Sequence, residues 1–130
     1  MERSLYLIFN HHLTEIQRED AFSSLGVDQV VEMPSDLKRL WREVPPHLPS
    51  IREYVHPVKQ WLKWLAKEGD FVLIQGDFGA TYIMVNFAFQ NGLIPLYSTT
   101  TREAVEEHID EGSVKLNHVF RHVMFRQYGA

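Results

Sequence analysis

Short, uninterrupted apolar runs alternate along the chain with longer segments in which apolar residues recur every three or four positions. Uninterrupted runs are typical of strands that are buried on both faces, as in a parallel sheet. Four such strands are predicted, at residues 5–9, 28–33, 70–75 and 93–98. The segments between them are therefore the candidates for helices that cover the sheet.

The segment after the first strand carries a clear helix signal. Thr14 is followed three residues later by Gln17, the spacing of a capping box, and the apolar face ends at Gly26. Amphipathic spacing predicts further helices from a cap at Ser35, over residues 51–67 and over residues 80–91. Pro57 lies inside the second of these and predicts a kink or a break.

The pattern changes after residue 102, where the two faces begin to alternate in part. Residues 104–110 and 114–128 flank a Glu-Gly-Ser turn, which predicts an antiparallel hairpin. The strands and helices before it, taken in succession, predict a parallel sheet with right-handed crossovers. The expected fold class is therefore α/β, with a mainly parallel sheet flanked by helices and a C-terminal antiparallel β-hairpin, in a single domain over residues 1–130.

Composition narrows the functional classes. The chain has 130 residues, is 45% hydrophobic and contains no cysteine, which excludes disulfide frameworks, thiolate zinc sites and cysteine nucleophiles. A formal net charge of -4 argues against a sequence-independent grip on long nucleic acid but leaves room for a small anionic ligand. The apolar runs predict neither a secretory leader nor a membrane span, so we expect a soluble, cytoplasmic protein.

Two loops stand out by their chemistry and by their expected position. For a strand order such as 2-1-3-4, ligands bind where the order reverses, between the carboxyl ends of the first and third strands. The loops that emerge there are residues 10–14 and 75–81. Gly76 and Gly79 permit positive φ and a close approach to the backbone, while the following helix directs free N–H groups at a ligand, as suits a phosphate. The alternative is that Gly76 only turns the chain and Gly79 only allows close packing.

Polar residues near the same edge suggest a reactive pocket. His11 or His12 can act as a base, an acid or a phosphate donor near neutral pH, or can simply face water. Thr100, Thr101 and Arg102 follow the fourth strand and can complete the pocket. The alternative for these three is a solvated turn that begins a helix.

Two further groups of residues invite a functional interpretation that the pattern does not favour. His118 and His122 lie four residues apart, a metal-binding spacing on a helix, but they fall on a predicted strand, so no metal site is expected. Trp41, Trp61 and Trp64 lie among leucines at helical spacing and are expected to be core or interface residues.

Three segments together resemble a known family. They read LIFNHHLTEIQ, LIQGDFGATYIMVNFAFQNGLIPLYSTTTRE and VFRHVMFRQY, in this order. They resemble small CRISPR-associated accessory proteins of type III systems, which are regarded as ring nucleases and as Rossmann-like relatives of the cyclic-oligoadenylate sensor (CARF) domains. The resemblance covers nearly the whole chain and implies a Rossmann-like fold.

The resemblance also implies a ligand and a reaction. The ligand is cyclic tetra-adenylate, and its cleavage switches the antiviral response off. Cleavage proceeds by attack of a ribose 2'-hydroxyl on its own phosphodiester, which leaves a 2',3'-cyclic phosphate and needs neither a metal nor another cofactor. The implied catalytic residues are His11, Asp77 and Arg102. The implied ligand-binding residues are Asn10, His12, Gln75, Gly76, Phe78, Gly79, Ala80, Thr81, Thr100 and Thr101.

Two positions depart from the family pattern, since Asn10 stands where a serine is expected and His12 where the residue varies. Asp77 is also difficult to place, because a carboxylate repels a polyanion unless it bonds a hydroxyl or an amino group or orients His11. A symmetric ring suits a two-fold homodimer, with apolar residues near the fourth strand or the terminal hairpin at its interface.

Other functions remain open at this stage. The nearest alternative is a non-catalytic protein that sequesters the cyclic oligoadenylate. A second is a sensor that regulates a partner through the tryptophan-rich segment 51–67. A third treats both loops as packing turns without function.

Overall fold

A five-stranded, mostly parallel sheet organises the chain in the computed structural model, which describes residues 2–130. The order of the strands is β2-β1-β3-β4-β5, and the first four are mutually parallel. Only β5 runs antiparallel, against β4. The strands are β1 (Ser4–Ile8), β2 (Gln29–Glu32), β3 (Phe71–Ile74), β4 (Ile94–Asp110) and β5 (Ser113–Gln127). This architecture confirms the predicted fold class, and the parallel strands have the order 2-1-3-4 that was taken as an example in locating the edge where the order reverses.

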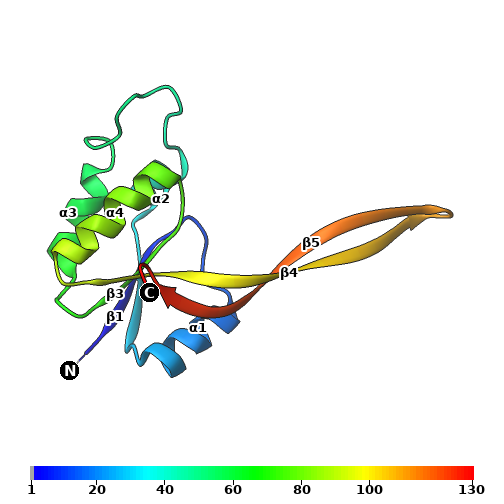
Figure 1. Cartoon of the computed structure of the whole chain (residues 1–130), viewed down its shortest axis with the longest axis horizontal. Helices are drawn as coiled ribbons and strands as arrows, with labels where there is room; N and C mark the ends of the chain where they lie inside the picture. Colours follow the sequence, from blue (N-terminus) through cyan, green and yellow to red (C-terminus); the bar gives the residue numbers. More distant parts are fainter. Residues whose placement is uncertain (1) are drawn as a thin grey trace.

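Helices cover both faces of the sheet (Figure 1). On one face lie α1 (Glu15–Asp20) and η1 (Ala21–Leu25), one turn of π-helix that continues it. On the other lie α2 (Ser35–Arg42), α3 (His56–Leu65) and α4 (Phe78–Gln90). None of the helices in residues 2–130 is both long and apolar enough to cross a membrane.

The buried strands explain the two cores, because successive side chains point to opposite faces. In β1, Tyr6 and Ile8 join the core under α2, α3 and α4, whereas Leu5 and Leu7 join the core under α1. Each fully buried aliphatic side chain of this kind contributes about 1.5–3 kcal/mol relative to exposure. Uninterrupted apolar runs are therefore needed at these strands, as the sequence pattern indicates.

The helix starts agree with the sequence at one position and differ at two. The capping box is present, with Thr14 Oγ1 accepting from Gln17 N at 3.2 Å and Thr14 N donating to Gln17 Oε1 at 2.9 Å. Ser35 is not a cap but the first residue of α2. The helix predicted from residue 51 begins only at His56, because the chain before it forms turns; Pro57 marks the predicted break and lies in the first turn of α3, where a missing N–H costs nothing.

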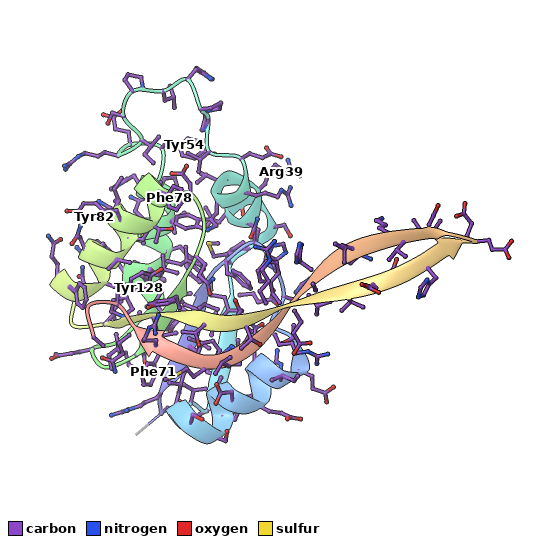
Figure 2. All side chains as sticks on the ribbon, turned by 45° about the vertical axis from the view of Figure 1, so that its right-hand side comes forward. Arg39, Tyr54, Phe71, Phe78, Tyr82 and Tyr128 are labelled. Carbon is purple, nitrogen blue, oxygen red and sulfur yellow. The ribbon has the colours of Figure 1, made fainter. Side chains whose placement is uncertain are left out.

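The last two strands differ most from expectation. A strand ending at residue 98 was predicted, yet β4 runs unbroken to Asp110 and pairs with β5 beyond a turn that lies within the predicted Glu-Gly-Ser segment. Residues 101–121, called the arm from here on, project from the rest of the molecule, the body (Figure 1). The alternative of a turn and a helix start at residues 99–103 is therefore wrong. Side chains extend from both faces of the arm (Figure 2).

Candidate functional site

The carboxyl ends of β1 and β3, together with the neighbouring part of β4, border two cavities, one on each face of the sheet. Tyr97 and Ser98 are neighbours on β4 and therefore point to opposite faces, Tyr97 into the first cavity and Ser98 into the second. Gln75, directly after β3, lines both. A single pocket was predicted at this edge, whereas the sheet divides the predicted residues between two cavities.

The first cavity lies on the side of α4 and has a volume of about 340 Å³. Tyr128 closes it, with its hydroxyl donating to Ile74 O at 2.5 Å, and burial raises the pKa of this phenol. Thr81 Oγ1 is buried without a hydrogen-bond partner among the described residues. The lining residues are Gln75, Gly76, Phe78, Thr81, Tyr97 and Tyr128.

The glycines of the loop after β3 have a different role from the one predicted. Neither Gly76 nor Gly79 adopts positive φ, so the expectation of left-handed backbone there is wrong. Gly76 instead makes room for Trp41, because an added Cβ would lie 2.5 Å from the indole Nε1. That Nε1 donates to Gln75 O at 2.9 Å, which ties the loop to the core. Close packing, the alternative weighed for Gly79, is thus what this structure shows at Gly76, for which only a turn of the chain had been considered.

Asp77 is the N-cap of α4. Its Oδ2 accepts from Ala80 N at 3.0 Å, the hydrogen bond that a cap side chain makes with the third residue of a helix. The carboxylate also meets the positive end of the helix dipole. The Asp77 carboxylate thus accepts the hydrogen bond of an N–H group that was predicted to bind a phosphate. The Phe78 side chain beside it is 95% exposed.

The second cavity lies on the side of α1 and has a volume of about 390 Å³. Two of its lining residues, Ser98 and His122, belong to a chain of three hydrogen-bonded side chains. Ser98 Oγ lies 2.5 Å from His122 Nδ1, and His122 Nε2 lies 2.7 Å from Asp20 Oδ2. The imidazole is only 3% exposed and the Asp20 side chain 20% exposed. A hydroxyl, an imidazole and a carboxylate are therefore linked in series, with the imidazole almost fully buried.

The polarity of this chain follows from the carboxylate. Burial raises the pKa of Asp20, but the hydrogen bonds from Ser24 and His122 outweigh it and hold that pKa below its usual value. An ionised carboxylate only accepts, so His122 Nε2 must carry a hydrogen and donate it. In the neutral ring Nδ1 is then an acceptor, and the Ser98 hydroxyl donates to it.

Two glutamine side chains fix Ser98. Gln17 Nε2 donates to Ser98 Oγ at 3.3 Å, and Ser98 N donates to Gln75 Oε1 at 2.9 Å. The ring of Phe125 lies 4.6 Å from that of His122 and restrains the imidazole from the other side. The complete lining of the second cavity is Phe9, Thr14, Ile16, Gln17, Gln75, Ser98, Thr100, Val119, Phe120, Arg121 and His122.

The predicted histidines lie near this cavity without lining it. His11 is exposed, and its ring lies 5.3 Å from that of Phe9, which does line the cavity. His12 is 82% exposed and turns to Glu32, with 2.8 Å between Nδ1 and Oε1. The pKa of Glu32 is lowered, first by its hydrogen bond from Lys38 and less by His12. Asn10, in the same loop, is half-buried.

The predicted residues after β4 are divided between the body and the arm. Thr100 lines the second cavity. Thr101 and Arg102 are exposed on the arm, where the Arg102 guanidinium carbon lies 5.9 Å from the centroid of the Phe120 ring. The structure thus brings Gln75 and Thr100 together and leaves His11, Asp77 and Arg102 outside a common pocket.

The sequence did not predict the three hydrogen-bonded side chains at this edge. Asp20, Ser98 and His122 come from α1, β4 and β5, and up to 102 positions separate them along the chain. His122 was noticed only for its spacing from His118. No local motif joins the three, so their contact could be found only from the fold.

The lowered pKa of Asp20 predicts how stability changes with acid. A carboxyl whose pKa is lower in the folded state contributes stability above its unfolded value, 3.8, and this contribution is lost as the pH falls through the folded value. We expect the difference in unfolding free energy between wild type and Asp20→Asn to shrink as the pH falls below about 4. Urea unfolding at several pH values measures this, and a difference that stays constant to pH 2 would contradict it.

Taken together, these observations define an α/β protein with two cavities at the edge where β1 and β3 end. The chain matches the model of the family described as the uncharacterized protein MJ1673 family over residues 3–126, and it belongs to that family. A protein of that name from Methanocaldococcus jannaschii is 46% identical over 124 residues, which cover 95% of each chain. No solved structure matches the chain.

Proposed function

We propose that this protein is a metal-independent ring nuclease that binds and cleaves cyclic tetra-adenylate, and so switches off type III CRISPR antiviral signalling. The observation that carries the proposal is the second cavity, which lies at the reversal of strand order and combines apolar rings with hydroxyl, amide and imidazole groups. The motif resemblance, which spans nearly the whole chain, supplies the ligand.

The lining suits pieces of an oligoadenylate. Phe9 and Phe120 offer faces against which adenine can stack, and Arg121, whose Nε pairs with Glu103 at 3.1 Å, places its guanidinium at the cavity edge. Thr100 and Gln75 offer hydrogen bonds to ribose or phosphate. The reaction needs in-line placement of the 2'-hydroxyl, donors for the phosphorane oxygens and transfer of two protons, all of which side chains can provide. His11, Asp77 and Arg102 remain the residues that the resemblance nominates.

A homodimer completes the proposal, with the arm as its interface. The arm exposes apolar side chains on both of its faces, at Val105, Ile109, Val114, Leu116, Val119 and Phe120. An isolated two-stranded ribbon is at best marginally stable in water, so a second copy that covers these side chains stabilises it. The arm joins the body at the second cavity, and two-fold pairing therefore places two sites beside one interface.

Charge supports a second copy as the partner of the arm. The β4 part of the arm carries Glu103, Glu106, Glu107 and Asp110 beside Arg102, whereas the β5 part has neither Asp nor Glu and carries Lys115 and Arg121. Arg121 Nε already pairs with Glu103 of its own arm at 3.1 Å. In a two-fold arrangement the other acidic side chains of one arm can lie against Lys115 of the other.

A binding protein that sequesters the ring without cutting it is the second candidate. The position of His11 favours this candidate, because His11 is not one of the described residues that line the two cavities. In this candidate the same cavities hold the ring, and loss of the imidazole alters neither affinity nor product.

The test is incubation of the protein with radiolabelled cyclic tetra-adenylate in EDTA, followed by chromatography. Linear products that end in a 2',3'-cyclic phosphate are expected, slowed by about 10²-fold or more in His11→Ala if this side chain transfers a proton. His47→Ala, an exposed histidine outside both cavities, is the matched control. Tight binding without product would favour sequestration, and neither binding nor cleavage would refute both candidates.

A further inference from the structure

We propose that the Ser98 hydroxyl accepts the proton of the attacking 2'-hydroxyl, with His122 as the base behind it and Asp20 as the group that fixes the tautomer of His122. This inference rests on the proposed function and names the proton acceptor of that reaction. It assigns a role to three residues that neither the motif resemblance nor the family match singles out.

The geometry gives the direction of proton flow. His122 Nε2 carries its hydrogen toward Asp20 Oδ2, 2.7 Å away, so Nδ1 is free to accept the proton of Ser98, whose oxygen lies 2.5 Å away. When Nδ1 takes that proton, the carboxylate 2.7 Å from Nε2 offsets the positive charge of the ring. The side chains thus form a relay that leads from the cavity to a buried acceptor.

The placement of Ser98 suits contact with a ligand. Ser98 and His122 both line the second cavity, whereas Asp20 lies behind the imidazole and does not line it. Ser98 is held at its main chain by Gln75 and at its hydroxyl by Gln17. A fixed hydroxyl with an acceptor behind it is the arrangement that proton transfer requires.

The step balances as follows. The O2'–H bond breaks and its proton passes to Ser98 Oγ, while the original Ser98 proton passes to His122 Nδ1. The O2'–P bond forms and the P–O5' bond breaks, which gives the 2',3'-cyclic phosphate and a 5'-oxygen. A water molecule, assisted by His11 as the resemblance implies, protonates that oxygen, and the imidazolium of His122 later returns its proton to the resulting hydroxide. In this scheme Ser98 is the catalytic residue, and His122 and Asp20 act through it.

The arrangement also has a purely structural interpretation, in which the three groups only join α1 to the β4–β5 pair. The two interpretations differ in what a small base can restore. A structural tie is not repaired by free imidazole, whereas a missing proton acceptor is. They differ again for Asp20→Asn, because an amide can present a donor to Nε2 and reverse the tautomer without removing the side chain.

The experiment measures single-turnover cleavage of radiolabelled cyclic tetra-adenylate, with its dissociation constant measured alongside, for full-length wild type and four variants. Ser98→Ala, His122→Ala and Asp20→Asn are expected to lower the cleavage rate by about 10²-fold or more with the dissociation constant changed by less than about threefold. Added imidazole is expected to restore part of the rate of His122→Ala only. His47→Ala is the matched control, an exposed histidine outside both cavities and outside the arm, and keeps the wild-type rate.

A second measurement separates the failure of this inference from that of the proposed function. Nitrogen-15 NMR of the wild-type histidines is expected to show His122 as the Nε2–H tautomer, whether or not the ring is cleaved. An Nδ1–H tautomer overturns the relay, and so do variants that cleave at the wild-type rate. Wild type that cleaves nothing while showing the Nε2–H tautomer overturns the proposed function, and with it the part of Ser98 in this reaction. If Ser98→Ala or His122→Ala does not fold, Asp20→Asn and the tautomer decide.

Discussion

Removing the arm leaves a folded monomer. Residues 102–120 are deleted, and Thr101 is joined to Arg121 by Asn-Gly. Thr101 and Arg121 are opposite each other in the antiparallel register, so a two-residue turn can close this shortened hairpin. We expect the wild type to have twice the mass of one chain by light scattering at micromolar concentration, and the deletion variant to have the mass of a single chain.

The physical reason is that the body contains both hydrophobic cores, whereas the arm exposes its apolar side chains. The buried core residues of both cores lie outside residues 101–121, so the deletion leaves the core side chains in place. The deleted segment exposes Leu116 by 62% and Ile109 by 63%, and their contacts in the dimer are the ones that this variant loses. Circular dichroism and a cooperative thermal transition check that the body remains folded.

A single substitution provides the sharper control. Phe120→Asp places a charge on the arm, at a side chain that is 63% exposed, and is expected to raise the dissociation constant of the dimer by at least 100-fold, as about 3 kcal/mol implies. Phe89→Asp places the same charge on α4, at a side chain that is 54% exposed, and is expected to leave the dimer intact. A monomeric wild type, or a deletion variant that stays dimeric, would show that the arm has another purpose.

The sheet could be predicted because its signals are local. An apolar run is visible in the sequence wherever a strand is buried on both faces, and the capping box at Thr14 needs only four residues. The extent of β4 could not be predicted in the same way. Its polar half is supported by pairing with β5, and the residues from Thr101 to Asp110 bury no face that a hydrophobic pattern would reveal.

The site was predictable in position but not in composition. Topology alone indicates the edge where β1 and β3 end, and both cavities lie there. Which side chains meet depends on the face of the sheet to which each strand residue points. Tyr97 and Ser98 are adjacent in sequence and therefore face different cavities. The contact of Asp20 with His122 also depends on how α1 crosses the sheet, which no motif encodes. Gly76 was predicted to allow a ligand to approach the backbone, whereas the group that approaches it closely is the Trp41 indole.

Trp41→Ala is expected to destabilise the protein by about 3–5 kcal/mol, the range for removal of a buried large aromatic side chain. Trp41 is 2% exposed and belongs to the core under α2, α3 and α4. Its removal leaves a void beneath Gly76 and leaves Gln75 O without the indole donor. Urea unfolding measures the loss, and a matched control is Trp64→Ala, which removes an indole that is 88% exposed and is expected to cost less than about 0.5 kcal/mol.

Trp41→Phe extends the same argument from the core to the site. It keeps an aromatic ring but loses the N–H, so the destabilisation is expected to fall to about 1–3 kcal/mol. The lost hydrogen bond is one of two that hold the main chain of Gln75, the other running from Gln75 N to Ile8 O at 3.2 Å. The Gln75 side chain in turn accepts from Ser98 N at 2.9 Å. Because the loop after β3 then has one tether fewer, Ser98 is less firmly placed, and cleavage of the cyclic oligoadenylate is expected to slow even where the protein remains fully folded. Equal stability of Trp41→Ala and Trp64→Ala would contradict the core position of Trp41, and an unchanged cleavage rate in Trp41→Phe would show that the loop is positioned without the indole.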